Sequence, residues 1–332
     1  MSFWEDQRVL ITGGAGFIGS SLVKRLVFEG ADVQVVDNLW RGNLNNLKNA
    51  NGDYIIDFDN KFHLADLTDY AKCLEIISDV DWIFHLADVV GGVKFAFENE
   101  LFIFRQNILI NTNVLTAAIE NSIPNYIYVG TACSFPKHLQ MGPGFSYLRE
   151  NQTYPAQPES SYGWSKLMGE YEAEIAQTTN KINVGLIRFH NVYGPGAPYE
   201  GDRAQVLPSL IRKVINYPEE PFIIWGSGNQ YRDFLYIDDA VESLIRVGQY
   251  GMNEGLIQIG SEKPTTIREA AELIIKISGK VVNKEYDLSK PEGDLGRVGI
   301  CHRAHKILHW NAQISLEEGL EKTIKWVTDQ MQ

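Results

Sequence analysis

Three glycines spaced three residues apart occupy the junction between the first apolar run of the chain and the amphipathic stretch that follows it. Gly13, Gly16 and Gly19 come directly after residues 8–12, which have a strand pattern, and open residues 17–29, which have a helical one. In such a strand–turn–helix unit the first glycine forms the tight turn, the second lets a pyrophosphate approach the backbone, and the third lets helix and strand pack closely. The spacing therefore predicts a dinucleotide-binding unit, with the phosphates at the helix N-terminus.

The first half of the chain continues this alternation of apolar strands and amphipathic helices. Strand patterns lie at residues 8–12, 32–37, 61–64, 81–86, 125–130 and 183–189. Helical patterns lie at residues 17–29, 70–78, 104–121 and 161–178. Strands that alternate with helices lie parallel in one sheet with helices on both faces. The predicted fold class is therefore α/β, a doubly wound parallel sheet of the Rossmann type.

The pattern changes after residue 189, where glycine and proline become frequent. Helical patterns at residues 206–215, 237–249, 267–278 and 315–330 then mix with short strands at 222–225 and 256–259. We expect a nucleotide-binding domain over residues 1–189 and a smaller, mixed α/β substrate lobe over residues 190–332. We also allow for a return of the chain to the first sheet around residues 234–260. The Asn-rich segment 38–60 is expected to be irregular.

An acidic residue at the end of the second strand pattern indicates which dinucleotide is bound. Asp37 can accept hydrogen bonds from the adenosine ribose and would repel a 2′-phosphate, which favours NAD, although Arg41 argues mildly against this. Asp66 can either contact adenine or begin the next helix. The cofactor-binding residues that we expect are Gly13, Gly16, Phe17, Ile18, Gly19, Asp37, Asn38, Asp66, Leu67, Leu86, Ala87, Tyr162 and Lys166.

A tyrosine and a lysine lie one helical turn apart in the fourth helical pattern. Because positions i and i+4 share a helix face, Tyr162 and Lys166 can point at one site. A phenol is a poor base at neutral pH, and a neighbouring cation lowers its pKa towards the working range. Thr131 ends the fifth strand, where its hydroxyl can meet the same substrate oxygen. The spacing alone also fits an ordinary surface helix, but beside a glycine-rich turn it predicts oxidation of a hydroxyl.

Composition argues against several classes of function. The net charge of −12, from 30 basic and 42 acidic residues, makes a nucleic-acid-binding surface improbable. Cys73, Cys133 and Cys301 are odd in number and lack metal-ligand spacing, which fits a reduced cytoplasmic setting without a metal site. The sequence shows neither a signal-peptide pattern nor an apolar stretch long enough to span a bilayer. We therefore predict no membrane association.

Together these motifs resemble the extended short-chain dehydrogenase/reductases, the NAD-dependent epimerase/dehydratase family that acts on nucleotide sugars. Nearly the whole chain takes part in the resemblance, through residues 12–19, 85–88, 131, 162–166, 188–195, 225–234 and 293–297. It implies that Tyr162 deprotonates a sugar hydroxyl, usually at C4, while NAD takes the hydride. It implies that Lys166 also holds the nicotinamide ribose and that Thr131 hydrogen-bonds the reacting oxygen. A homodimer through a four-helix bundle of helices 104–121 and 161–178 is implied as well.

A narrower resemblance, to GDP-mannose 3,5-epimerases and GDP-fucose synthases, lies in residues 129–137 and 154–158. It implies a GDP-linked sugar and an acid/base role for Cys133, because a C4 ketone acidifies the hydrogens at C3 and C5 and a thiol can exchange protons there. The alternative for Cys133 is a small buried filler. The substrate contacts implied are Gly91, Gly92, Asn191, Arg203, Gln205, Val206, Trp225, Arg232 and Arg297. Ion pairs are the alternative for two of them, Arg232 with Asp233 or Asp238 and Arg297 with Asp294.

One position departs from this group of enzymes. Where they carry a lysine or histidine as the second acid/base, this chain has Gln205, whose amide cannot exchange protons at neutral pH. Substitutes nearby are Asp202, Tyr199 and His190, of which the last fits a structural role better. We therefore predict an NAD-dependent epimerase that acts through a 4-keto intermediate on a GDP-manno-type sugar. The alternative is a C4 dehydrogenase of such a sugar, for example a GDP-heptose, without epimerisation.

Two further classes are less consistent with the sequence. A 4,6-dehydratase has an acidic pair after the threonine, where this chain has Ala132 and Cys133. A non-catalytic NAD-binding sensor often loses the tyrosine or the lysine, and this chain keeps both.

Overall fold

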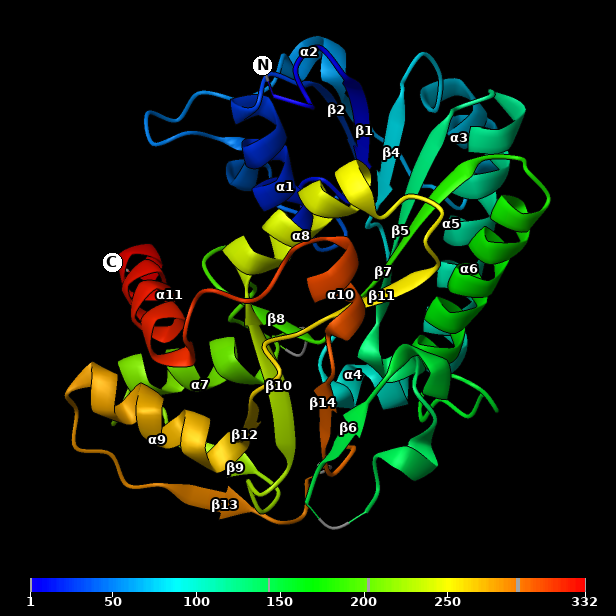
Figure 1. Ribbon diagram of the computed structural model, residues 1–332. Helices are drawn as coiled ribbons and strands as arrows, with labels where there is room; N and C mark the ends of the chain where they lie inside the picture. Colours follow the sequence, from blue (N-terminus) through cyan, green and yellow to red (C-terminus); the bar gives the residue numbers. More distant parts are fainter. Residues whose placement is uncertain (1, 143, 202–203, 291–292, 332) are drawn as a thin grey trace.

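A seven-stranded parallel sheet forms the centre of the computed structural model, which describes residues 2–142, 144–201, 204–290 and 293–331 (Figure 1). The strand order is β11-β7-β5-β4-β1-β2-β3. Their bounds are β1 (Arg8–Thr12), β2 (Asp32–Asp37), β3 (Phe62–Leu64), β4 (Trp82–His85), β5 (Asn125–Thr131), β7 (Asn183–Phe189) and β11 (Leu256–Ile259). The order reverses between β1 and β4, and ligands of such sheets bind beyond the carboxyl ends of the strands at this reversal. The expected α/β fold class is confirmed.

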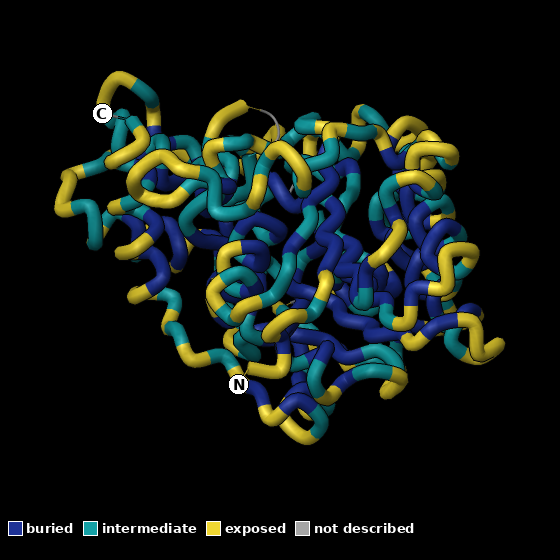
Figure 2. Tube along the Cα trace, turned by 90° about the horizontal axis from the view of Figure 1, so that it is seen from above, coloured by how far each residue is buried: buried dark blue, intermediate teal, exposed yellow. Residues whose placement is uncertain are grey.

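Helices cover both faces of the sheet because residues along each strand alternate between two apolar cores. Val9 and Ile11 of β1 belong to one core, whereas Leu10 belongs to the other. The first core includes α1 (Phe17–Phe28) and α8 (Ile237–Tyr250), and the second includes α3 (Tyr70–Ile76), α5 (Glu100–Glu120) and α6 (Ser161–Thr178). Figure 2 shows the buried stretches running through the middle of the molecule, with exposed turns at its rim.

A second lobe lies beyond the carboxyl ends of the strands. Its helices are α7 (Val206–Ile215), α9 (Ile267–Ser278), α10 (His302–Ile307) and α11 (Leu316–Met331). Its short strands are β8 (Asn191–Tyr193), β9 (Ile223–Trp225), β10 (Tyr231–Tyr236), β12 (Pro264–Thr266), β13 (Glu285–Asp287) and β14 (Arg297–Gly299). β14 pairs with β6 (Ser146–Leu148), a strand from the first half of the chain, and the two lie side by side in Figure 1. The first apolar core continues from the sheet into this lobe, so the two parts share one interior.

Most long elements have the bounds that the sequence predicts, and the differences are local. The segment expected to be irregular contains a 3-10 turn at Leu44–Leu47 and the short helix α2 (Phe58–Lys61). Helix α5 begins at Glu100, four residues before its expected start, and a further helix, α4 (Val93–Glu98), precedes it. The three-residue strands of the second lobe, apart from β9, were not predicted, because such strands are too short to show a periodic pattern.

A buried ion pair fixes α6 to the sheet. Arg188 of β7 is fully buried, and its Nε donates to Glu170 Oε1 of α6 at 3.1 Å, with a second contact from Nη2 to Oε2. Arg188 Nη1 also donates to Thr153 Oγ1, and the guanidinium lies 4.4 Å from the ring centroid of Phe135. Gly130 is required beside this pair, since a Cβ there would lie 2.0 Å from Glu170 Oε1.

We predict that Arg188→Met lowers the free energy of unfolding by about 3–5 kcal/mol, because it leaves the Glu170 carboxylate buried without its cation. Urea denaturation followed by circular dichroism measures this. Arg8→Met is the control, since Arg8 forms its ion pairs with Asp79 and Asp81 at the surface, where such pairs contribute little. Equal stability of the two variants would contradict the prediction.

Candidate active site

A cleft of about 1430 Å³ opens between the carboxyl ends of the sheet strands and the second lobe. Its walls come from the glycine-rich turn, the segment after β4, the end of β5, the start of α6, and residues of α7, β9, β10 and β14. Of the predicted site residues, Asp66 is not among those that line it, and Arg203 lies outside the described residues. Every other predicted site residue lines this one cleft.

The glycine-rich turn has the geometry that a pyrophosphate requires. Gly13 has φ +68°, and a Cβ there would lie 3.0 Å from the backbone of Ala87. A Cβ on Gly19 would lie 2.2 Å from the carbonyl oxygen of Gly13, so only glycine lets α1 start this close to β1. Gly16 is the N-cap of α1, and no side chain caps this end of the helix. Its first N–H groups therefore remain available to an anion, beside Phe17 and Ile18.

Asp37 is held at the end of β2 with its carboxylate towards the same turn. Its Oδ2 accepts from the N–H of Ala15 at 3.0 Å, and its Oδ1 accepts from the N–H of Leu39 at 2.8 Å. Burial raises the pKa of Asp37, and these two backbone donors oppose that rise. Each oxygen keeps a further lone pair for a ribose hydroxyl. Asp66, by contrast, is exposed and accepts from the N–H and hydroxyl of Thr68.

A buried chain of hydrogen bonds joins the glycine-rich turn to α6. The Thr12 hydroxyl accepts from the N–H groups of Leu86 and Ala87 and lies 2.8 Å from His85 Nδ1. On its other side His85 Nε2 lies 3.0 Å from Asn111 Oδ1, so the neutral ring donates through Nε2 and accepts from Thr12. Burial, together with the charge of Lys166, lowers the pKa of His85 to about 3.

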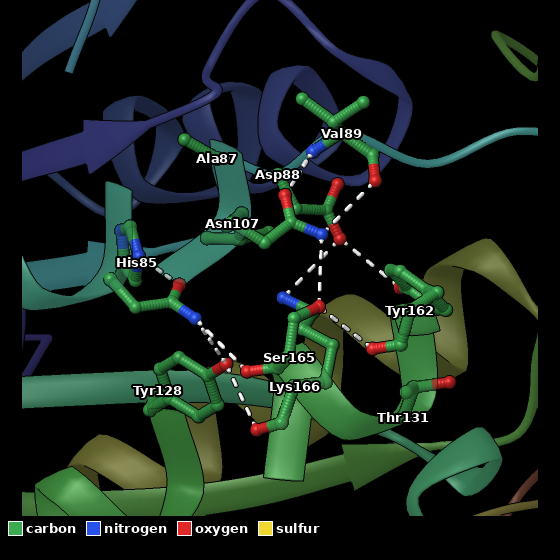
Figure 3. Close-up of polar contacts among 12 residues, drawn as sticks. His85, Ala87, Asp88, Val89, Asn107, Tyr128, Thr131, Tyr162, Ser165 and Lys166 are labelled. Atoms are coloured by element: carbon green, nitrogen blue, oxygen red, sulfur yellow. Dashed lines mark hydrogen bonds and ion pairs between the residues drawn. The ribbon is translucent and has the colours of Figure 1, made fainter. Parts of the chain in front are cut away.

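Tyr162 and Lys166 converge on a third side chain, Asp88 (Figure 3). The Tyr162 hydroxyl donates to Asp88 Oδ2 at 3.1 Å, and Lys166 Nζ lies 3.3 Å from the same oxygen. Both residues are in the first turns of α6, which starts at N-cap Ser160 with its side chain accepting from the N–H of Gly163. Thr131 ends β5 beside them.

The electrostatics of Tyr162 differ from the expectation based on the tyrosine–lysine spacing. Burial, and then the charge of Asp88, raise the pKa of Tyr162 well above its usual value. The expected lowering of the Tyr162 pKa by Lys166 is therefore not seen. Asp88 pairs with the cation and also accepts a hydrogen bond from the phenol. The sequence motif at residues 85–88 contained Asp88, but without the fold no signal placed its carboxylate between the two side chains.

Cys133 lies in a short 3-10 turn after β5, where it lines the same cleft. Its Sγ is 3.3 Å from Arg297 Nη2, which donates to it, and Arg297 Nη1 pairs with Asp294 Oδ2 at 2.6 Å. The pairing of Arg297 with Asp294 is thus present, and Arg297 also contacts the thiol. Arg232 donates through Nη1 to the carbonyl oxygens of Tyr231 and Asp294. Burial, and then repulsion from Arg297, lower the pKa of Arg232 to about 10.

The remaining predicted residues surround this centre. Asn191 starts β8, and its Oδ1 is buried without a hydrogen-bond partner among the described residues. Gln205 is the N-cap of α7, and its side chain accepts no capping hydrogen bond there. Gly91 and Gly92 follow a loop that Asn107 fastens to α5 through Val89. His190 is buried against Gln258 and lies 4.0 Å from Asp233, and Asp202 is outside the described residues.

The described residues contain neither a cluster of metal-binding side chains nor a membrane-spanning helix. In that part of the chain no group of three or more His, Cys, Asp or Glu side chains is arranged to hold a metal ion. None of its helices combines the length and the apolar character needed to cross a bilayer.

The chain belongs to the NAD dependent epimerase/dehydratase family, whose sequence profile matches residues 9–260, and it is an NAD-dependent enzyme. It is 32% identical to GDP-mannose 3,5-epimerase of Arabidopsis thaliana, over 99% of this chain and 85% of that protein. It is 28% identical to GDP-L-fucose synthase of Escherichia coli K12, over 96% of each. The structure of UDP-glucose 4-epimerase of Thermotoga maritima with UDP-glucose superposes with a TM-score of 0.86, covering 98% and 99% of the two chains at 26% identity.

The cleft fits NAD at the positions just described. The turn at Gly13–Gly19 and the N-terminus of α1 suit the pyrophosphate, and Asp37 suits the adenosine ribose. When bound, NAD would supply a hydride acceptor beside the substrate. Beside it, Tyr162 would hold or release a proton at its hydroxyl. Lys166, which forms an ion pair with Asp88, would orient a ribose.

We predict that Asp88→Asn lowers the pKa of Tyr162, because it removes a negative charge that disfavours the phenolate and frees the charge of Lys166. The ultraviolet difference spectrum of tyrosinate, taken against Tyr162→Phe in each background, should show ionisation at lower pH than in the wild type. Asp53→Asn, at an exposed loop position, is the control. An unchanged titration would mean that Asp88 does not govern the phenol.

Proposed function

We propose that this enzyme oxidises a GDP-manno-type sugar at C4, epimerises one or both neighbouring carbons, and reduces C4 again. The observation that supports it is the position of the Cys133 thiol, which lines the same cleft as Tyr162 and Thr131 and contacts Arg297. The guanine base and the manno configuration rest on similarity to the Arabidopsis and E. coli enzymes.

The residues divide into two chemical tasks. Tyr162 takes the proton of the C4 hydroxyl as the hydride leaves C4, and Thr131 hydrogen-bonds the oxygen that becomes a ketone. That ketone acidifies the hydrogens at C3 and C5, and the Cys133 thiol exchanges a proton with one of these carbons. Arg297 donates a hydrogen bond to the Cys133 sulfur, which places a cation beside this group. Arg232 and Arg297 suit the substrate's diphosphate, since guanidinium groups match phosphate oxygens.

We predict that incubation with GDP-mannose in deuterated water places deuterium at C3 or C5 of the recovered sugar, without net NADH. Mass spectrometry and proton NMR locate the label, and absorbance monitors NADH. Tyr162→Phe should abolish the exchange, since no ketone forms. The absence of deuterium from both carbons with wild-type enzyme would contradict the epimerase function.

A C4 dehydrogenase that releases the 4-keto sugar is the second candidate, and Gln205 is the observation that favours it. The amide lines the cleft at the N-terminus of α7, where it cannot transfer a proton. This enzyme would form NADH in proportion to substrate consumed, or depend on an external oxidant, and the experiment above distinguishes it by its NADH.

The enzyme acts in the cytoplasm as a homodimer, in which α5 and α6 of two copies form a four-helix bundle. These helices lie together along one side of the molecule (Figure 1), and both expose large apolar side chains, among them Leu101, Leu109, Tyr171 and Ile175. Exposed apolar side chains gathered on neighbouring helices are typical of an interface.

We predict that Leu109→Glu combined with Ile175→Glu converts the dimer to a monomer, because both charges would be buried in the bundle. Multi-angle light scattering at micromolar concentration measures the mass. Val281→Glu, at a nearly fully exposed position outside these helices, is the control and should leave the dimer intact. A monomeric wild type would contradict the proposal directly.

A further inference from the structure

The backbone around Asp88 is fixed by a hydrogen-bonded side chain on each side of it. Before Asp88, the N–H of Ala87 donates to the Thr12 hydroxyl at 3.1 Å. After it, Asn107 of α5 accepts from the N–H of Val89 at 2.6 Å and donates to the Val89 carbonyl oxygen at 3.1 Å. Asn107 is fully buried, where hydrogen bonds are stronger than in water. The fold therefore sets the place of the Asp88 carboxylate in the wall of the cleft.

Asn107 also joins this segment to the helix that carries the phenol. Its Nδ2 donates to Ser165 Oγ at 3.2 Å, and Ser165 Oγ donates in turn to the carbonyl oxygen of Tyr162 at 2.9 Å. Figure 3 shows this path beside the contact between the Tyr162 hydroxyl and Asp88 Oδ2, which are 3.1 Å apart. The phenol and the carboxylate are thus held together through their backbones as well as through their own hydrogen bond.

Four titratable groups surround the phenol, and one of them is a carboxylate in direct contact with it. Asp88 comes from the segment after β4, Tyr128 from β5, Cys133 from the turn after β5, and Lys166 from the helix of Tyr162 itself. Among these groups it is Asp88 that accepts the hydrogen bond of the phenol hydroxyl. Its side chain lines the cleft and is 15% exposed. The proton of the phenol therefore has a base within hydrogen-bonding distance.

A neutral phenol can accept a proton only if its own proton leaves at the same time. Because burial and the charge of Asp88 raise the pKa of Tyr162, the phenol carries its proton at neutral pH. The base that Tyr162 needs for the oxidation of a hydroxyl must then lie on the far side of its own oxygen, where the hydrogen bond to Asp88 is found.

We propose that Asp88 is the proton acceptor behind Tyr162: it takes the proton of the phenol as Tyr162 takes that of the C4 hydroxyl, and it returns the proton when C4 is reduced. This inference rests on the proposed oxidation at C4, which the epimerase and the C4 dehydrogenase have in common.

The transfer balances for atoms and electrons. The O–H bond of the C4 hydroxyl breaks as one forms on Tyr162, and the former O–H bond of the phenol breaks as one forms on Asp88. The electron pair of the C4–H bond leaves with the hydride, so C4 is oxidised with reduction of bound NAD. The departing hydride makes the C4 hydroxyl strongly acidic, since its oxygen would otherwise become positive, and a carboxylate is then a sufficient base. Reduction of C4 reverses each step.

The test follows C4 oxidation by the full-length enzyme with NAD and GDP-mannose, as NADH absorbance in a single turnover, from neutral pH to the range in which tyrosine ionises. Asp88→Asn keeps the shape of the side chain but removes the base. It should lower the rate at neutral pH by roughly 100-fold, at the low end of general acid–base catalysis. The rate should then recover as the pH rises, because the phenolate that forms accepts the proton without a relay. The wild type should show no such rise.

A matched control is available in Glu29, a carboxylate that pairs with Arg25 and does not line the cleft. Its side chain is 14% exposed, almost as for Asp88, and Glu29→Gln should match the wild type. Asp88→Glu keeps a carboxylate and should be faster than Asp88→Asn at neutral pH. Adding Cys133→Ser to Asp88→Asn should leave the alkaline recovery in place, which assigns it to the phenol and not to the thiol.

NAD affinity, measured by isothermal titration calorimetry without substrate, gives a readout that does not depend on turnover. Asp88→Asn should bind NAD at least as tightly as the wild type, because the charge of Lys166 is then free to meet a ribose. Weaker binding together with the pH dependence of the wild type would overturn the relay, since Asp88 would then act only by holding Lys166.

The remaining outcomes separate this inference from the function on which it rests. A rate in Asp88→Asn at neutral pH equal to or above that of the wild type would overturn the relay, because Asp88 would then only restrain the phenol. A low rate that does not recover at high pH would overturn it as well. NADH formation by the wild type without deuterium at C3 or C5 would overturn the epimerase and leave the relay intact. The absence of NADH formation by the wild type would overturn both.

Discussion

The buried hydrogen-bond chain from Thr12 to Lys166 is the constraint on which the geometry of this active site depends. It runs through His85, Asn111 and Tyr128, whose hydroxyl donates to the carbonyl oxygen of Lys166 at 3.1 Å. Each member is paired on both sides, so none can turn without leaving a buried polar group unsatisfied. The chain begins at the strand that carries the glycine-rich turn and ends at the helix that carries Tyr162 and Lys166. The glycine-rich turn and the start of this helix are therefore held as one unit.

The cations of the site are matched by carboxylates, as a protein of net charge −12 allows. Asp88 faces Lys166, and Asp294 faces Arg297. An anionic nucleotide sugar thus meets a site whose positive charge is already partly balanced. Arg232 differs from the other cations of the site, because burial and repulsion from Arg297 lower its pKa. A diphosphate bound between Arg232 and Arg297 would relieve that repulsion. The favourable electrostatic free energy of binding would then arise mainly at the diphosphate end of the substrate.

The sequence predicted the parts of this molecule whose signals are local or periodic. The strands and helices of the first sheet have long apolar periods, and Gly13, Gly19, Tyr162 and Lys166 lie in motifs with fixed spacing. Contacts between distant segments left no such trace. Asp88 is far in sequence from Tyr162 and Lys166, and only the fold brings its carboxylate to both side chains. Predictions from spacing therefore identified the residues of the cleft but not the hydrogen bonds and ion pairs among them.

The start of α6 brings Tyr162 close to the turn that holds Cys133. Glu159 precedes the N-cap Ser160, and Tyr162 follows within the first turn. Gly163 then lets the turn that holds Cys133 approach, since a Cβ there would lie 2.3 Å from the carbonyl oxygen of Cys133. The phenol of Tyr162 and the turn that carries the Cys133 thiol thus lie at one helix terminus, and the Arg188–Glu170 pair fixes that helix to the sheet.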